Sequence, residues 1–157
     1  MTTATKQPQE ILLKKPRTKT YAYAQVLESS ISYFNGDELA ATTWMNKYAM
    51  KDADGEFVEQ SPDDMHKRMA KEFGRIEADY KLKYSLNGSA KFLSKYGQER
   101  EDLTEEKIYN YFKKFGYIIP QGSVMSSLGN HYKLASLSNC IVVPEMHDSY
   151  GGVFYTD

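Results

Sequence analysis

The residues best suited to chemistry lie near the C-terminal end of the sequence, around its single cysteine. Cys140 stands at the start of an apolar run within the stretch LASLSNCIVVPEMHDSYGG, residues 134–152. A thiolate is a nucleophile, a metal ligand and a redox group. A lone cysteine has no disulfide partner in its own chain, and His66, His131 and His147 share no recognised metal-ligand spacing with it. The thiol is therefore either a buried spectator or the partner of a group on another polypeptide.

Composition limits the class of protein that carries this thiol. The 157 residues, 41% of them hydrophobic, are enough for one domain with its own core. The formal net charge of -1 supplies no excess of Lys or Arg for general nucleic-acid binding. Neither a signal peptide nor a run of eighteen or more apolar residues is recognisable. We expect a cytoplasmic protein without nucleic acid or membrane among its partners.

Helix signals dominate the first two thirds of the chain. Apolar residues recur at spacings of three and four in residues 21–34, 36–51, 61–80 and 103–116. Asp37, Ser61 and Thr104 are the expected N-caps, with Pro62 at the first position of the third helix. Gly116 stands where a C′ glycine would end the fourth helix.

The expected core follows from the same periodicity. The predicted buried stripes contain Ala40, Trp44 and Tyr48, then Met65, Met69, Phe73 and Ile76, then Ile108, Tyr111, Phe112 and Phe115. His66 has polar neighbours in the sequence and is expected at the surface, like the other two histidines, so no metal site is predicted.

The segments between and after these helices have a different character. Residues 52–57 (DADGEF) have the composition of a turn or short hairpin, and residues 81–103 predict a long surface connection holding one short helix. Residues 117–130 predict a short strand that enters a loop, and Cys140–Val143 predict a second strand that Pro144 ends. Helices followed by two short strands predict the beginning of a longer α/β fold.

Three motifs in this order resemble a known family. SPDDMHKRMAKEFGRIE (61–77), FGYIIPQGSVMSSLGN (115–130) and ASLSNCIVVPEMHDSYGGV (135–153) resemble the start of the large, catalytic subunit of ribonucleotide reductase, in its bacterial or phage form without an ATP-cone. The resemblance covers roughly residues 21–157. It implies an α/β fold in which a mainly helical region precedes a ten-stranded α/β barrel.

The resemblance also implies a division of the chain. Residues 1–20 would be a flexible N-terminus, 21–116 the helical N-terminal region, and 117–157 the start of the catalytic barrel, incomplete in this chain. No ATP-cone would precede Tyr21, so no part of the chain would sense ATP against dATP.

The family pattern assigns chemistry to the C-terminal stretch. Cys140 would be one half of the redox-active cysteine pair, with its disulfide partner outside this chain. Ser123, Ser138 and Asn139 would contact the ribonucleotide substrate, although the family usually carries serine at the position of Asn139. An amide still donates and accepts hydrogen bonds.

Further partners follow from the same resemblance. Asp148 and Ser149 would contact a dNTP or ATP specificity effector, with the carboxylate accepting a hydrogen bond from its 3′ hydroxyl. This segment would bind no cofactor and no metal. The radical would come from a metal-containing small subunit, or alternatively from adenosylcobalamin, and thioredoxin or glutaredoxin would be the reductant.

Plainer interpretations exist for each of these residues. A lone cysteine on a strand is by default a small buried hydrophobe, Asp148 with Ser149 an ordinary loop cap, and Ser123 a turn residue. The thirteen tyrosines are expected to be packing residues. The rival function is a non-catalytic helical interaction module derived from the same family, using solvent-facing tyrosines and the thiol for assembly.

Overall fold

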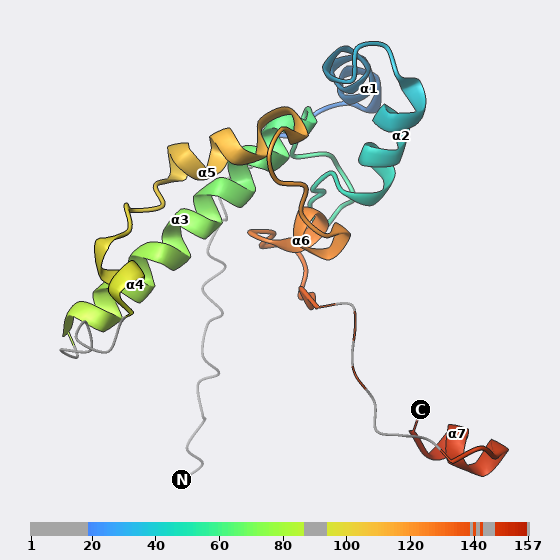
Figure 1. Cartoon of the computed structure of the whole chain (residues 1–157). Coiled ribbons are helices and arrows are strands. Elements are labelled where there is room, and N and C mark those ends of the chain that lie inside the picture. Colours follow the sequence, from blue (N-terminus) through green and yellow to red (C-terminus); the bar gives the residue numbers. More distant parts are fainter. Residues whose placement is uncertain (1–18, 87–93, 139, 141, 143–146, 157) are drawn as a thin grey trace, which may run out of the picture.

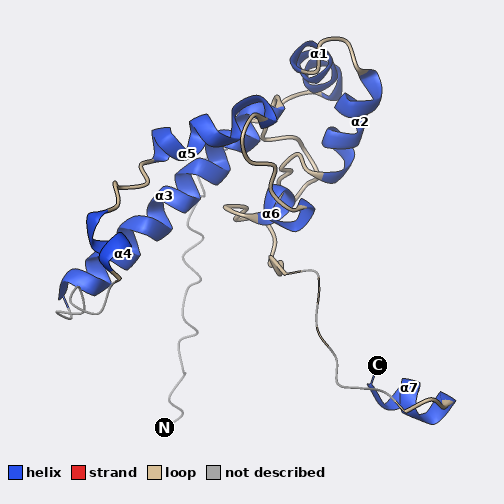
Figure 2. Cartoon of the chain, viewed as in Figure 1, coloured by secondary structure: helices blue, strands red, loops and turns tan. Residues whose placement is uncertain are grey.

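The structure, a computed structural model, describes residues 19–86, 94–138, 140, 142 and 147–156. Within them the chain is built from helices and loops (Figures 1 and 2). The helices are α1 (Tyr23–Tyr33), α2 (Glu38–Lys47), α3 (Pro62–Leu86), α4 (Lys95–Glu99), α5 (Glu105–Phe112), the 3-10 helix η2 (Lys113–Phe115), α6 (Gly122–Ser127) and α7 (Tyr150–Thr156). The mainly helical part of the predicted fold is confirmed.

Helices α1 and α2 form a hairpin joined by a tight turn. Asn35 and Gly36 adopt positive φ angles of 55° and 95°, which reverse the chain. Asp37 then caps α2 by accepting a hydrogen bond from the Ala40 amide at 2.9 Å, as predicted. The buried face of α2 is Ala41, Trp44 and Met45, so Trp44 was placed correctly.

The predicted turn at residues 52–57 is also confirmed. The Asp52 carboxylate accepts hydrogen bonds from the Asp54 and Glu56 amides at 3.0 and 2.9 Å. Phe57 forms isolated antiparallel bridges with Tyr21 and with Lys51, which bring the start of the described chain against this turn.

Helix α3 is the longest element, and α5 packs along it (Figure 1). It begins at Pro62 as predicted but runs to Leu86, beyond the expected end at residue 80. An ion-pair ladder stabilises the second half of the helix, because Arg75 contacts Glu72 at 2.7 Å and Asp79 at 2.5 Å on the exposed side. The surface connection is therefore shorter than predicted, and α4 is its one short helix within the described residues.

The predicted end of α5 is wrong in its detail. Thr104 caps the helix by accepting from the Lys107 amide at 3.3 Å, as expected. Gly116, however, has a φ of -74°, and the left-handed residues are Lys114 and Phe115 with φ of 54° and 55°. The chain reverses before it reaches residue 116, where a C′ glycine was expected to end the helix.

One core joins α1, α2, α3, α5 and α6. Its buried hydrophobic residues include Val26, Trp44, Met45, Met65, Met69, Ile108, Phe112, Met125 and Leu128. Phe73 and Tyr111 lie at the margin, each more than a third exposed, because α5 covers only part of the α3 face.

His66 is fully buried, which contradicts its predicted surface position. Its ring lies edge-on to Phe115 with 4.6 Å between ring centroids, and its Nδ1 lies 3.4 Å from the Tyr33 hydroxyl. Its Nε2 has no hydrogen-bond partner within the described residues. Burial lowers the pKa of His66 to about 4, against an opposing effect of Asp63.

The prediction of a strand and a loop over residues 117–130 is wrong. Residues 117–121 form no strand, and residues 122–127 form helix α6. Local composition favours a loop there, but Met125 and Leu128 are buried against the core and stabilise the helix. The predicted strand Cys140–Val143 falls partly outside the described residues, at 141 and 143, so the barrel strands stay a prediction.

Within the described residues, no helix is both long and apolar enough to cross a membrane.

His66 makes stability depend on pH. Its pKa is depressed in the folded chain, so the unfolded chain binds more protons between pH 6.5 and about 4. Stability that is complete above pH 6.5 is therefore lost as the pH falls, by roughly 2 kcal/mol between pH 7 and 5. Urea denaturation of wild type and His66→Leu at pH 7 and pH 5 measures this loss of stability. In His66→Leu, most of the difference in free energy of unfolding between the two pH values should disappear. The matched control is His131→Leu at an exposed position, which should keep it; an unchanged pH dependence in His66→Leu contradicts the assignment.

Candidate functional site

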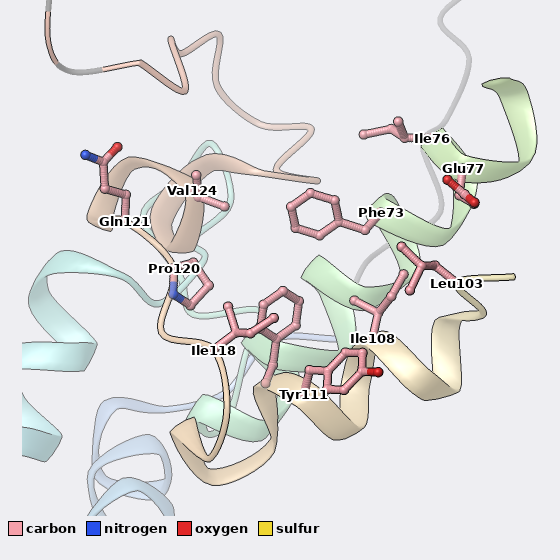
Figure 3. A pocket seen from close by; sticks show the side chains of 11 residues that line it. Phe73, Ile76, Glu77, Leu103, Ile108, Tyr111, Ile118, Pro120, Gln121 and Val124 are labelled. Carbon is pink, nitrogen blue, oxygen red and sulfur yellow. The ribbon is translucent and has the colours of Figure 1, made fainter. Parts of the chain in front are cut away.

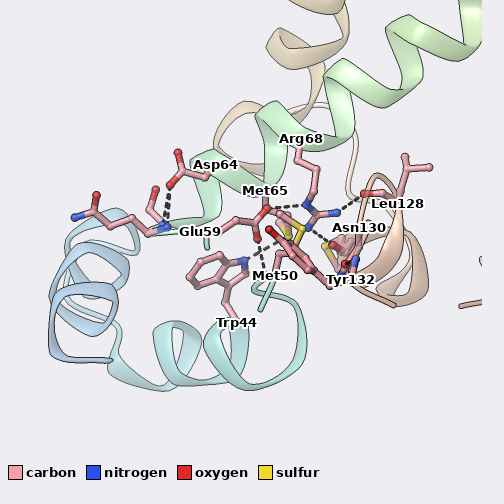
Figure 4. A network of polar contacts seen from close by, with 12 residues as sticks. Trp44, Met50, Glu59, Asp64, Met65, Arg68, Leu128, Asn130 and Tyr132 are labelled. Atoms are coloured by element: carbon pink, nitrogen blue, oxygen red, sulfur yellow. Dashed lines mark hydrogen bonds and ion pairs between the residues drawn. The ribbon is translucent and has the colours of Figure 1, made fainter. Parts of the chain in front are cut away.

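A buried ion pair holds the region that carries the predicted substrate residues. Arg68 of α3 donates from Nε to Glu59 Oε1 at 2.7 Å, and both side chains are less than a tenth exposed (Figure 4). Its two terminal nitrogens donate to the backbone oxygens of Met125, at 2.8 Å, and Leu128. Glu59 also accepts from the Met50 amide at 2.7 Å. The guanidinium thus joins α3, the segment before it and the C-terminal end of α6.

The turn after α6 approaches α3 closely. Gly129 has a φ of +71°, and a Cβ atom there would lie 3.1 Å from Arg68 Cγ. A side chain at this position would be strained in its backbone and crowded by α3. Glycine therefore allows the Leu128 carbonyl to reach Arg68.

Ser123 lies in the first turn of α6 and is tied to the segment after that helix. Its hydroxyl donates a hydrogen bond to the Leu137 carbonyl at 3.0 Å. Gly122, one residue earlier, sits where a Cβ would be 3.3 Å from the Tyr48 ring, so α6 begins close against the end of α2. Ser123 is thus held between the helical core and the stretch that leads to the cysteine.

Ser138 and Cys140 come next along this stretch. The Ser138 amide donates to Ser136 Oγ at 3.1 Å, and the Ser136 hydroxyl donates to the Ser138 carbonyl at 3.0 Å. The Ser138 hydroxyl donates to the Cys140 carbonyl at 3.4 Å. Cys140 itself is a free, exposed thiol, which is not the buried spectator of the plainer interpretation. Asn139 lies outside the described residues.

Asp148 and Ser149 lie elsewhere, at the beginning of α7. The Ser149 hydroxyl accepts from the Gly152 amide at 3.0 Å and so acts as a helix cap, while Asp148 is exposed. Figure 1 shows α7 apart from α6 and the other helices. The structure therefore brings Ser123, Ser138 and Cys140 into one hydrogen-bonded stretch, and does not bring the two effector residues to them.

An apolar groove lies between α3, α5 and the segment that leads into α6. It has a volume of about 430 Å³ and is lined by Phe73 and Ile76 of α3, Ile108 and Phe112 of α5, and Ile118, Pro120 and Val124 (Figure 3). The carboxylate of Glu77, at its edge, is paired with Arg100. The groove suits an apolar group and contains none of the predicted site residues.

The described residues bring together no group of three or more His, Cys, Asp or Glu side chains able to hold a metal ion.

Comparison with known proteins assigns the family. Residues 34–132, more than half of the chain, match the family model described as ribonucleotide reductase, all-alpha domain. The chain belongs to the ribonucleotide reductase family. This confirms the resemblance to the N-terminal portion of the large subunit. No curated protein and no solved structure matched the chain.

The reductase all-alpha domain includes the buried polar network, whose residues the sequence prediction missed. No motif marks Glu59, whereas Arg68 lies three residues after Met65 and one before Met69, within the predicted apolar stripe. A charge on the buried face of a helix signals an internal partner, and that signal was available. The acceptors at Met125 and Leu128 are backbone carbonyl oxygens, and no sequence pattern indicates which carbonyls a buried arginine contacts.

Removing the Arg68 side chain should destabilise the fold and release α6. Arg68→Met leaves the Glu59 carboxylate buried without its cation, which costs about 3–5 kcal/mol. Urea denaturation measures the loss, and hydrogen exchange should show faster exchange at residues 125–128. Arg75→Met, at an exposed ion pair of the same helix, is the matched control and should change stability by less than about 1 kcal/mol. Equal effects of the two variants would remove the special role of Arg68.

Ser123→Ala should loosen the approach to Cys140 without unfolding the domain. The lost hydrogen bond to Leu137 is exposed, so global stability should change by about 1 kcal/mol or less. Hydrogen exchange at residues 136–138 should accelerate. Ser127→Ala on the same helix is the control, and identical exchange in both variants would show that Ser123 does not hold this stretch.

Proposed function

We propose that this chain is the N-terminal part of a ribonucleoside-diphosphate reductase catalytic subunit, which reduces ribonucleotides to 2′-deoxyribonucleotides for DNA synthesis. The observation that carries the proposal is the match of residues 34–132 to the all-alpha domain, with the exposed Cys140 shortly after it in the chain. A free, accessible thiol next to a nucleotide-reductase domain is the group that the reduction requires.

Cys140 is one half of the reducing pair. The second cysteine belongs to the remainder of the catalytic subunit, since this sequence has only one. The two thiols give up two electrons and two protons and form one disulfide. At the ribose C2′, these electrons and protons break the C–OH bond, release its oxygen as water and leave a C2′–H bond. Thioredoxin or glutaredoxin then returns two electrons by dithiol exchange.

Ser123, Ser138 and Asn139 contact the ribonucleotide substrate. The hydroxyls of Ser123 and Ser138 each donate to a backbone carbonyl, which leaves their oxygen lone pairs available. Those oxygens accept hydrogen bonds from ribose hydroxyls, and the Asn139 amide supplies the donor for a phosphate or ribose oxygen. The hydrogen-bonded stretch that joins Ser123 to Cys140 supports a common substrate for these residues.

Asp148 and Ser149 hold the specificity effector, a dNTP or ATP. The exposed Asp148 carboxylate can accept a hydrogen bond from a 3′ hydroxyl. Ser149 caps α7 and so holds the backbone next to Asp148 in place.

The radical comes from a metal-containing small subunit, or alternatively from adenosylcobalamin. Either supplies the one-electron chemistry that starts the reaction, and we assign none of its ligands to this chain. The remainder of the catalytic subunit completes the barrel, and the enzyme works in the cytoplasm.

The chain alone should be inactive, and Cys140 should be essential in the complete enzyme. Mixing the chain with a polypeptide that carries the rest of the catalytic subunit, its radical source and a dithiol reductant should give deoxyribonucleotide. Cys140→Ser should lower turnover to background, because serine cannot form a disulfide. Ser127→Ala, on α6 with a side-chain hydrogen bond only to Ser126 among the described residues, is the control and should retain most activity. Turnover by the chain alone, or full activity of Cys140→Ser, would refute this mechanism.

The rival interaction module predicts different behaviour of the isolated chain. Tyr117 and Ile119 before α6, and Tyr150 and Tyr155 of α7, are between 69% and 93% exposed, and each pair offers apolar area that another polypeptide would cover. A self-sufficient module stays monomeric and unfolds cooperatively. A detached part of a barrel subunit aggregates or dimerises until its remainder is added. Sedimentation with and without the complementary polypeptide distinguishes the two.

A further inference from the structure

A second cleft lies on α3, away from all the proposed substrate and effector residues. It has a volume of about 660 Å³, and the turn after α6 forms its other wall. Arg68, Lys71, Glu72 and Arg75 line it from α3, at the three- and four-residue spacing that places side chains on one helix face. His131 lines it from the opposite side.

The opposite wall is fixed by the local chain. Gly129 brings the turn against α3, as its close approach to Arg68 shows. The Asn130 side chain accepts a hydrogen bond from the Tyr132 amide at 2.9 Å, and the Asn130 backbone amide donates to the Ser127 carbonyl at 3.0 Å. His131 lies between these two anchored residues, so its place facing α3 is built into the fold.

The cationic side chains that line the cleft differ in whether they are already paired. Arg68 is already paired, since each of its three side-chain nitrogens donates a hydrogen bond, to Glu59 or to a backbone carbonyl. Arg75 is paired with Glu72 and with Asp79, but its side chain is 58% exposed. Lys71 is exposed and forms no ion pair with any described residue. Glu72 is the one carboxylate among the described residues that line the cleft, against three permanent cations.

We propose that this cleft binds a polyphosphate anion. Lys71 supplies an unpaired point charge and His131 a ring N–H from the facing wall. Arg75 supplies a planar guanidinium that pairs with two phosphate oxygens as it pairs with a carboxylate. The cleft volume is ample for a chain of phosphates, and the proposal does not depend on the reductase reaction.

Glu72 is the built-in competitor for this anion. Its carboxylate contacts Arg75 Nε at 3.0 Å and Nη2 at 2.7 Å. These hydrogen bonds hold the pKa of Glu72 below its ordinary value, so it is ionised at neutral pH and repels phosphate. An incoming phosphate must replace this carboxylate on Arg75.

Titration calorimetry of the full 157-residue chain with inorganic tripolyphosphate tests the proposal. We expect one site, with affinity that falls as salt is raised to about 0.15 M. Lys71→Glu should weaken binding about tenfold, because it removes one attraction and adds one repulsion. Lys47→Glu, with the same change in net charge at an exposed lysine on α2, should change it by less than about twofold.

The sharpest variant is Glu72→Gln, which keeps the side-chain shape and removes the competing charge. It should tighten tripolyphosphate binding severalfold. Weaker or unchanged binding in Glu72→Gln, or an equal loss in Lys71→Glu and Lys47→Glu, would overturn the proposal and leave only nonspecific charge attraction. Circular dichroism of each variant confirms that the comparison is between folded chains.

The source of the phosphates is distinguished by a second ligand series. Equal affinity for tripolyphosphate and ATP shows that the phosphates alone are recognised, and tighter binding of ATP that Lys71→Glu weakens assigns the cleft, rather than Asp148 and Ser149, to a nucleotide. Both results support the cleft as a polyphosphate site. Sulfate binding as tightly as tripolyphosphate would exclude it, because a single tetrahedral anion would then suffice.

Discussion

The buried pairing of Arg68 with Glu59 is the contact on which the arrangement of the helices around the site depends. A guanidinium taken out of water must have its N–H groups satisfied, or the cost of burying its charge is not recovered. Here one side of the group faces a carboxylate and the other faces two carbonyls at the end of α6. The position of α6 is thus set by the electrostatic needs of a residue on α3.

The position of α6 in turn determines where the cysteine-bearing stretch begins. Ser123 lies at the start of the helix and donates to Leu137, so the stretch that contains Ser138 and Cys140 starts from a fixed point on the core. The cysteine remains exposed at the end of that stretch. A reactive thiol that must meet a second cysteine on another segment benefits from this combination of an anchored approach and an open side chain.

Local sequence signals made the helices predictable, whereas long-range contacts made the rest unpredictable. Asp37, Pro62 and Thr104 act at the helix starts where their side-chain chemistry alone places them. Helix α6 escaped prediction because glycine and serines give it little intrinsic propensity, and its stability comes from burial of Met125 and from Arg68, which lies 57 residues earlier in the chain. His66 was misplaced because its neighbours in sequence are polar, while its neighbours in space are aromatic rings of α1 and α5.

Of the candidate site, the sequence supplied the residue types and the family, and the structure supplied their grouping. The resemblance named Ser123, Ser138 and Cys140 together, and their hydrogen-bonded connection was not readable from spacing alone. The cleft between Lys71 and His131 had no sequence signal, because the two residues are separated along the chain and meet only through the turn at Gly129.

The left-handed backbone after α5 limits which residues can replace Lys114 and Phe115. Lys114 and Phe115 both adopt positive φ, a conformation that costs a residue with a Cβ about 1 kcal/mol or more relative to glycine. Phe115 offsets that cost through its ring contacts with His66 and Phe34. Lys114 is exposed and has no such compensation among the described ring contacts. Position 114 therefore tolerates substitution by glycine, asparagine or aspartate. Position 115 requires an aromatic residue, despite its unfavourable backbone conformation.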